Sequence, residues 1–167
     1  DVEEPEPKDL HPYGCMARVQ KMVKQSNNSV RILIEGLKRI RLLDFKQTDP
    51  YLLANVEYFH EPAEASLEAK ALVRSAKKLF EAILEKSPTL TDQVKSSNLN
   101  TEDPEKLSDL IGANLNLGLA DHQKLLSAHV VTERLKILLP LLKHELELQS
   151  IGARIQKEVT ASVSKSQ

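Results

Sequence analysis

The fold of the first third of this chain is decided by residues 14–35, which read GCMARVQKMVKQSNNSVRILIE. Apolar and polar side chains alternate on both sides of the polar segment QSNN at residues 25–28. A period of two is typical of a half-buried β-strand, and an Asn-Asn pair tolerates the positive φ of a tight turn. The stretch therefore predicts a β-hairpin. The side chains expected on one face of its first strand are Cys15, Ala17, Val19 and Val23.

Further strands are expected after the hairpin, at residues 37–42 and 52–59, with Gly36 marking a bulge or bend between the second and third strands. At Pro62 the period of the apolar residues changes from two to about 3.6, which indicates that strands give way to helices. The sequence therefore predicts three regions. They are an acidic loop or cut end at residues 1–13, an incomplete β-lobe at residues 14–62 and a helical lobe at residues 63–167.

Four segments of the helical lobe have helical signals. Apolar spacing predicts a helix over residues 64–86, and a short segment follows at residues 88–98. Asp103-Pro104 provides an N-cap acid with proline at the first helical position. A short helix is expected over residues 121–127, and Thr132 is expected to cap a long final helix. The predicted fold class is α+β: a partial antiparallel β-lobe, then an α-helical bundle ending in a long projecting helix.

The final helix has an apolar stripe that continues almost to the end of the chain. Its last members are Ile151, Ile155, Val159 and Val163. A helix of this length exceeds the diameter of a small domain, so its far end should project and its stripe should lack a partner within the chain. These four residues are therefore expected to pack against a partner outside the chain. Pro140 inside the helix removes one backbone hydrogen bond and is expected to kink it.

Composition excludes several classes of protein. The chain has 167 residues, 41% of them hydrophobic, and a net charge of -1, which is the balance of a globular protein without global attraction to nucleic acid. Residues 1–9 are too acidic and too rich in proline to bury much surface. One cysteine and no secretory signal indicate a reducing cytosol or a similar matrix, and with no apolar run longer than six residues the chain is not expected to cross a membrane.

No catalytic or metal site is expected. No glycine is followed by lysine, so a phosphate-binding P-loop is absent. His144-Glu145 begins a zinc-protease motif, but Leu148 stands where the second histidine is required. Ser75 and Ser162 each precede a lysine at the spacing of serine-lysine enzymes, without the partner motifs that those enzymes carry. The sequence therefore predicts no peptidase or ATPase activity on this chain.

One segment has an unusual local charge. Residues 18–41 contain seven basic residues and the single acid Glu35. A nucleic-acid surface is one interpretation, but no aromatic residue lies between Tyr13 and Phe45 to stack on a base. The other interpretation, which we favour, is the solvated face of a sheet.

Several segments together resemble a known family. They are Gly14-Cys15-Met16-Ala17-Arg18-Val19, Arg31-Ile32-Leu33-Ile34-Glu35-Gly36-Leu37-Lys38-Arg39, Asp103-Pro104 with Leu107, Asp109 and Ile111, His122-Gln123-Lys124-Leu125-Leu126, and Glu133-Arg134-Leu135 with Leu138, Leu142 and Glu145. In order and spacing they resemble the N-terminal region of the ATP-dependent Lon proteases. The family also begins with strands carrying Pro-Leu and Phe-Pro signatures, and nothing before Tyr13 resembles them. The chain therefore looks like an excised fragment.

The resemblance implies a PUA-like β-lobe, a helical bundle and a long helix that leads toward an AAA+ ATPase and a Ser-Lys protease domain. It also implies a hexameric parent that uses ATP and magnesium, with no cofactor on this fragment. The expected function is substrate recognition and assembly in an ATP-dependent protease of protein quality control. The expected partners are unfolded or tagged proteins and further copies of the same chain.

Substrate binding would require exposed apolar surface, because unfolded chains offer apolar side chains and extended backbone. The candidate substrate-binding residues are Leu33, Leu37 and Leu43, which could alternatively belong to the core. Two other functions remain open, namely a stand-alone Lon-like adaptor domain and nucleic-acid binding through residues 18–41.

Overall fold

The computed structural model describes residues 2–59, 66–87, 94 and 100–165. The chain divides into two compact units, at residues 1–61 and 62–167. Each unit is described by itself, beginning with the β-unit at residues 1–61.

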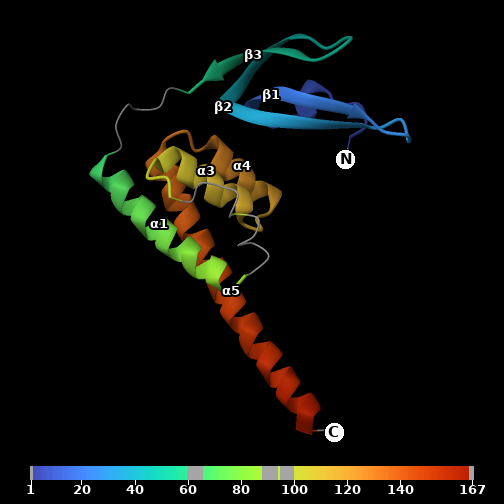
Figure 1. Cartoon of the computed structure of the whole chain (residues 1–167). Coiled ribbons are helices and arrows are strands. Elements are labelled where there is room, and N and C mark those ends of the chain that lie inside the picture. Colours follow the sequence, from blue (N-terminus) through green and yellow to red (C-terminus); the bar gives the residue numbers. More distant parts are fainter. Residues whose placement is uncertain (1, 60–65, 88–93, 95–99, 166–167) are drawn as a thin grey trace. The chain divides into compact units, whose positions relative to one another are not determined.

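The β-unit is a sheet of three antiparallel strands in the order β1-β2-β3 (Figure 1). A short 3-10 helix at Pro7–Asp9 precedes β1 (Tyr13–Lys24), β2 (Val30–Gln47) and β3 (Leu53–Tyr58). The predicted bulge at Gly36 is confirmed, but the predicted division into two strands there is wrong, because β2 runs through Gly36 as one strand of 18 residues. Gly36 stays opposite Ala17, and the register shift beside it leaves Leu37 as an extra residue. A bulge absorbs such a residue without ending a strand.

The predicted hairpin turn is confirmed at residues 25–29. The Gln25 N–H donates to the Ser29 carbonyl at 2.8 Å, and the Asn28 N–H donates to the Gln25 carbonyl at 3.2 Å. Asn28 adopts a positive φ of 62°, in the left-handed region that asparagine tolerates better than most residues. The Asn27 side chain accepts a hydrogen bond from the Ser29 N–H at 3.2 Å, which closes the turn.

A second register shift corrects the expected faces of β1. Val19 pairs with Ile34 and Lys21 pairs with Leu33, so Gln20 is an extra residue on β1. Since side chains alternate between the two faces of a strand, one extra residue moves those beyond it to the opposite face. Val23 therefore lies on the face opposite Val19, and Met22 takes the position that the simple alternation assigned to Val23.

The β-unit contains no buried residue within its described part. Near the start of β1, the rings of Tyr13 and Phe59 stack with centroids 6.2 Å apart, and the Tyr58 hydroxyl lies 3.7 Å from the sulfur of Met16. These contacts join the beginning of β1 to the end of β3. They leave both faces of the hairpin tip exposed.

The helical unit at residues 62–167 contains the core of the chain. Its described helices are α1 (Leu67–Glu85), α3 (Pro104–Asn114), α4 (Leu119–Ser127) and α5 (Val131–Lys165). Apolar side chains from all four helices pack together, and α1 lies along the first half of α5 (Figure 1). The largest fully buried apolar members are Phe80, Ile83, Leu107, Ile111, Leu135, Leu138 and Leu142. The expected short segment at residues 88–98 lies outside the described residues except for Val94, which is buried.

Two N-caps fix the entries of α1 and α3. The Ser66 hydroxyl accepts from the Ala69 N–H at 3.1 Å. The predicted cap Asp103 is confirmed, since its carboxylate accepts from the backbone N–H of Glu105 at 3.0 Å. Thr132 is not the N-cap of α5, because the helix begins one residue earlier, at Val131.

The helix α5 is continuous over 35 residues, and Pro140 does not end it. Its buried residues stop at Leu142, and every described residue from Ile151 to Lys165 is exposed. The second half of α5 extends beyond the end of α1 (Figure 1). We call residues 148–165 the tail. The predicted helical projection is confirmed.

Candidate functional site

The hairpin formed by β1 and β2 presents two chemically different faces. Residues directly opposite each other in an antiparallel pair place their side chains on the same face, so the register assigns each residue. The apolar face carries five large apolar side chains, Val19, Met22, Val30, Ile32 and Ile34, and Lys24 lies opposite Val30 at its turn end. Each of these five side chains is between 45% and 63% exposed. Within the β-unit, no described element covers this face.

The opposite face, which we call the basic face, has four cations. It is formed by Arg18, Lys21, Val23, Arg31, Leu33, Glu35 and Lys38. Nearest the turn, Val23 lies opposite Arg31, and in the next row Lys21 lies opposite Leu33. We call these four residues the checkerboard, because each apolar side chain has a cation across the strands. Farther from the turn, Glu35 accepts a hydrogen bond from Gln20 at 2.5 Å and lies 3.8 Å from Arg18.

The three candidate substrate-binding leucines are all exposed but do not form one cluster. Leu33 is 61% exposed and belongs to the checkerboard. Leu37 is 39% exposed and is the extra residue at the first register shift of β2. Leu43 is 47% exposed and lies at a shift between β2 and β3. The alternative that these leucines belong to a core does not hold in this structure.

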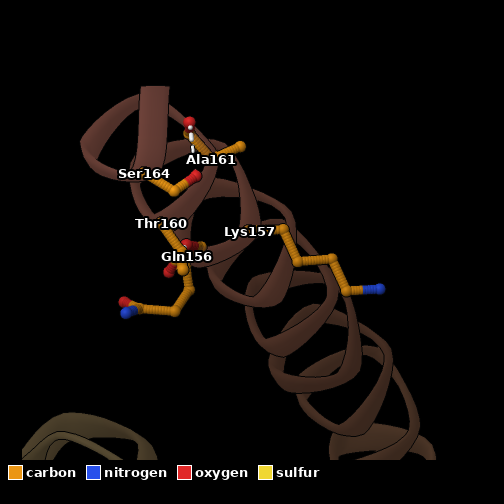
Figure 2. Close-up of a pocket in the computed structure, with 5 residues that line it drawn as sticks. All are labelled: Gln156, Lys157, Thr160, Ala161 and Ser164. Atoms are coloured by element: carbon orange, nitrogen blue, oxygen red, sulfur yellow. Dashed lines mark hydrogen bonds between the residues drawn. The ribbon is translucent and has the colours of Figure 1, made fainter. Parts of the chain in front are cut away.

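The candidate assembly residues lie on the tail, as expected. Ile151, Ile155, Val159 and Val163 are 38%, 51%, 51% and 55% exposed. Near them, Gln156, Lys157, Thr160, Ala161 and Ser164 line a shallow depression (Figure 2). All five belong to one helix, and the hydroxyls of Thr160 and Ser164 donate to carbonyls of the same helix at 2.8 and 3.0 Å. A depression with a single wall gives a ligand no enclosure, so we assign no binding site there.

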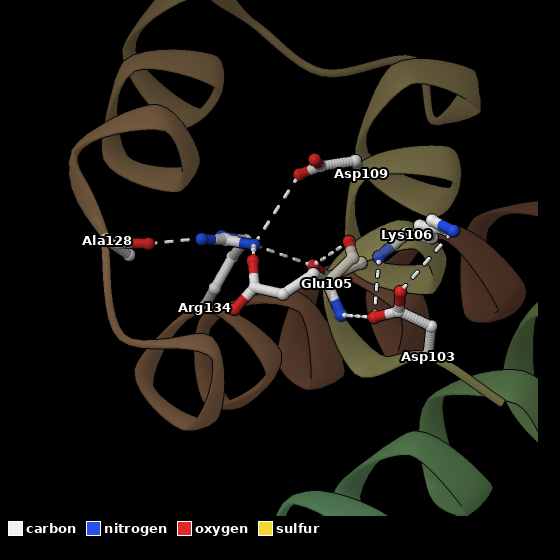
Figure 3. A network of polar contacts seen from close by, with 7 residues as sticks. Asp103, Glu105, Lys106, Asp109, Ala128 and Arg134 are labelled. Atoms are coloured by element: carbon white, nitrogen blue, oxygen red, sulfur yellow. Dashed lines mark hydrogen bonds and ion pairs between the residues drawn. The ribbon is translucent and has the colours of Figure 1, made fainter. Parts of the chain in front are cut away.

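A buried ion-pair network joins α5 to α3 (Figure 3). The Arg134 side chain is 1% exposed, and its guanidinium donates to the carboxylate of Glu105 and, at 3.0 Å, to the Ser108 hydroxyl. Its Nε donates at 3.0 Å to the carbonyl of Ala128, between α4 and α5. The Nη2 of Arg134 and the Oε1 of Glu105 are buried without a hydrogen-bond partner in the described protein. The network connects α5 to α3 and to the segment between α4 and α5, and it leaves no accessible surface for a ligand.

The role of Arg134 was not predicted from the sequence, although a signal was present. Arg134 stands three residues after Val131 and four before Leu138, so helical spacing places it on the buried stripe of α5. A charged residue on such a stripe requires a buried partner. The partner could not be found by spacing, because Glu105 belongs to a different helix.

Asp44 of β2 has two polar partners, one on the same strand and one on β3. The Lys46 ammonium lies 3.0 Å from the Asp44 carboxylate, and the Asn55 amide donates to it at 3.0 Å. Hydrogen bonding from Lys46, followed by that from Asn55, lowers the pKa of the Asp44 carboxyl. Both interactions favour the charged form, and the hydrogen bond from Asn55 also joins β3 to β2.

The described residues contain neither a metal site nor a helix suited to cross a membrane. Within residues 2–59, 66–87, 94 and 100–165, no group of three metal-binding side chains comes together. In the same part of the chain, no helix combines the length and the apolar character that a membrane span requires. Cys15 is exposed as a free thiol.

A three-stranded antiparallel sheet and a helical unit with its own core define an α+β protein. Residues 1–144 match the family model of the ATP-dependent protease La (LON) substrate-binding domain, and the chain belongs to this family. The match confirms the resemblance drawn from the sequence. The region matched is the substrate-binding domain of Lon, and the catalytic domain is not present in this chain.

Relatives of known sequence and structure agree with this assignment. The Lon protease of Dictyoglomus thermophilum is 32% identical over 99% of this chain, and that of Koribacter versatilis is 37% identical over 99%. The chain spans 21% of the length of each of these relatives. The solved N-terminal domain of the Mycobacterium avium complex Lon protease has a TM-score of 0.68 and 25% identity, over 86% of this chain and 74% of that one. The predicted α+β fold class is confirmed.

Proposed function

We propose that this chain recognises protein substrates for a Lon protease by binding unfolded polypeptide at the β1–β2 hairpin. The observation that supports this most is the exposure of eight large apolar side chains on that hairpin, in a unit whose described residues include none that is buried. They are Val19, Met22, Val23, Val30, Ile32, Leu33, Ile34 and Leu37. Exposed apolar patches of this kind mark binding surfaces, because covering them removes apolar area from water.

Binding of a labelled unfolded protein tests this function directly. Fluorescence anisotropy with reduced and alkylated α-lactalbumin should show saturable binding to the chain. The triple variant Leu33→Ser, Leu37→Ser, Leu43→Ser should weaken that binding by at least about threefold, since each side chain loses only part of its apolar contact. A matched control is Leu67→Ser with Leu119→Ser, which removes two exposed leucines from the helical unit.

The control variant should bind as tightly as the parent chain, and circular dichroism should show that both variants remain folded. Two results contradict the function. One is the absence of binding to the unfolded protein, and the other is an equal loss in the triple variant and in the control.

The tail is the second part of the proposal, as an element of assembly. Ile151, Ile155, Val159 and Val163 recur every four residues and form one i±4 ridge. Two such ridges can interdigitate, with the helices crossing at about -50°. A second copy of the chain supplies an identical ridge, which supports a role for the tail in the hexamer expected of the longer protein.

Cofactor binding and cellular location are proposed for the longer protein. Because the chain spans about a fifth of its relatives, ATP and magnesium would be bound by other parts of the longer protein. Its expected location is the bacterial cytoplasm, where the substrates would be misfolded and regulatory proteins.

A further inference from the structure

We infer that the checkerboard of Lys21, Val23, Arg31 and Leu33 selects acidic, leucine-containing segments among the unfolded polypeptides that the chain binds. This inference rests on the function proposed above and adds a charge preference to it. It depends on the basic face alone. The apolar face is not required for it.

The four side chains of the checkerboard form a small apolar surface flanked by two cations. Register pairs Lys21 with Leu33 and Val23 with Arg31, in two adjacent rows of one face. Leu33 is 61% exposed and Val23 is 45% exposed, so an apolar side chain from a partner can cover both. Each of the two cations lies beside this small apolar surface. A partner that places a leucine there would bring its neighbouring residues close to Lys21 and Arg31.

The charges of Lys21 and Arg31 are not balanced by acidic side chains in the described part of the chain. Neither Lys21 nor Arg31 has an ion-pair partner among the described side chains, whereas Arg41 faces Glu57 at 3.2 Å and Lys46 faces Asp44 at 3.0 Å. The acid on the same face, Glu35, already contacts Gln20 and Arg18. Carboxylates of a partner would therefore find two free cations, while a basic segment would be repelled.

The side chains of the checkerboard favour a peptide partner over a nucleic acid. A nucleic acid would also be attracted to cations, but single strands bind through aromatic residues that stack on bases. The apolar members of the checkerboard are aliphatic, and no aromatic residue lies between Tyr13 and Phe45. The chain also has a net charge of -1. Aliphatic side chains between cations fit a peptide with alternating leucine and glutamate better than they fit a base.

The experiment uses the whole 167-residue chain and three labelled peptides of equal length. The first alternates glutamate and leucine, the second replaces glutamate with lysine, and the third replaces leucine with serine. At about 50 mM salt, fluorescence anisotropy should show that the glutamate-leucine peptide binds at least about fivefold tighter than the lysine-leucine peptide. The preference should shrink at about 500 mM salt, because exposed charges are then screened. The serine peptide should bind more weakly than the first.

Variants separate the charge from the apolar contact. Lys21→Glu with Arg31→Glu should reverse the preference, so that the lysine-leucine peptide binds more tightly. Leu33→Ser should weaken the glutamate-leucine peptide and leave the serine peptide unchanged. The matched control is Lys70→Glu with Lys78→Glu on α1, which makes the same change in net charge at exposed positions of the helical unit. This control should retain the preference for glutamate.

Three results would overturn the inference. The first is equal binding of the glutamate and lysine peptides, and the second is an unchanged preference in the Lys21 and Arg31 double variant. The third is displacement of the peptide by a short oligothymidylate at lower concentration, which would assign the basic face to nucleic acid. Failure of this inference differs from failure of the proposed function. Unfolded α-lactalbumin would still bind, without any effect of the two charge reversals.

Discussion

The guanidinium of Arg134 in α5 donates a hydrogen bond to the carboxylate of Glu105 in the first turn of α3. The two residues are 29 positions apart in the chain, and the Arg134 side chain is 1% exposed. The Glu105 backbone N–H is in turn bound by the cap Asp103. One buried cation therefore fixes the start of α3 against α5. The same guanidinium also holds the Ala128 carbonyl before α5.

Replacing Arg134 with methionine should lower the free energy of unfolding by about 3 kcal/mol, since a buried charge would lose its partner. We expect the lower end of the usual range, because Nη2 of Arg134 and Oε1 of Glu105 are already unpaired. Urea unfolding followed by circular dichroism measures this change. The control is Lys136→Met, which breaks the exposed pair with Glu68 and should cost less than about 1 kcal/mol. An equal loss in both variants would refute the structural importance of Arg134.

Hydrogen exchange should distinguish the stabilities of the two units. Amides of residues 30–34 in β2 should exchange faster than those of residues 72–83 in α1, because the β-unit lacks buried described residues and α1 packs against the core. The measurement must be made at a concentration where the chain is monomeric, since an exposed strand edge can pair with another chain. Equal protection of the two segments would show that the hairpin is stabilised by contacts not seen here.

Two glycines of the helical unit should respond differently to alanine. At Gly152 in the tail, a Cβ would meet nothing within 4 Å, so alanine should stabilise the local helix by up to about 1 kcal/mol. At Gly112 in α3, a Cβ would lie 3.3 Å from the Cδ1 of the buried Leu125, which would have to shift by a few tenths of an ångström within the core. Gly112→Ala should therefore lower global stability in urea unfolding. Gly152→Ala should instead slow amide exchange in the tail, and the reverse pattern would contradict both assignments.

The helices were predictable because their signals are repeated many times. The period of 3.6 in α1 continues through Val73, Ala76, Phe80 and Ile83, all of which are buried. The cap of α3 was equally clear, since Asp103-Pro104 combines two start signals. The start of α5 was misplaced by two residues, because Thr132 is a plausible cap and the choice depends on backbone conformation rather than on residue type.

The strands were less predictable because one extra residue changes a whole face. Met22 and Val23 are both apolar, so the sequence did not show where the alternation of β1 shifts. The extra residue is Gln20, and it places Val23 beside Arg31 on the basic face. The checkerboard therefore could not be found from the sequence alone. Leu33 was correctly proposed as an exposed position, but its cationic neighbours come from pairing across the hairpin.

The last prediction concerns the tail and its partner. Ile155 and Val159 are each 51% exposed, so packing against a second copy would remove the remaining apolar area from water. Full burial of an aliphatic side chain contributes about 1.5 to 3 kcal/mol, and these residues would gain roughly half of that. In the longer protein that includes the ATPase, Ile155→Asp with Val159→Asp should therefore weaken concentration-dependent assembly in analytical ultracentrifugation. The helical unit should remain folded.

A matched control separates the stripe from a general effect of charge on the helix. Ala153 and Ala161 are exposed and each lies two positions from a stripe residue, which places them on the other side of the helix. Ala153→Asp with Ala161→Asp adds the same two charges and should leave assembly unchanged. If both double variants assemble normally, the stripe does not join copies of the chain. If both are impaired equally, the charge or a loss of helix explains the effect, and the ridge of Ile151, Ile155, Val159 and Val163 needs another explanation.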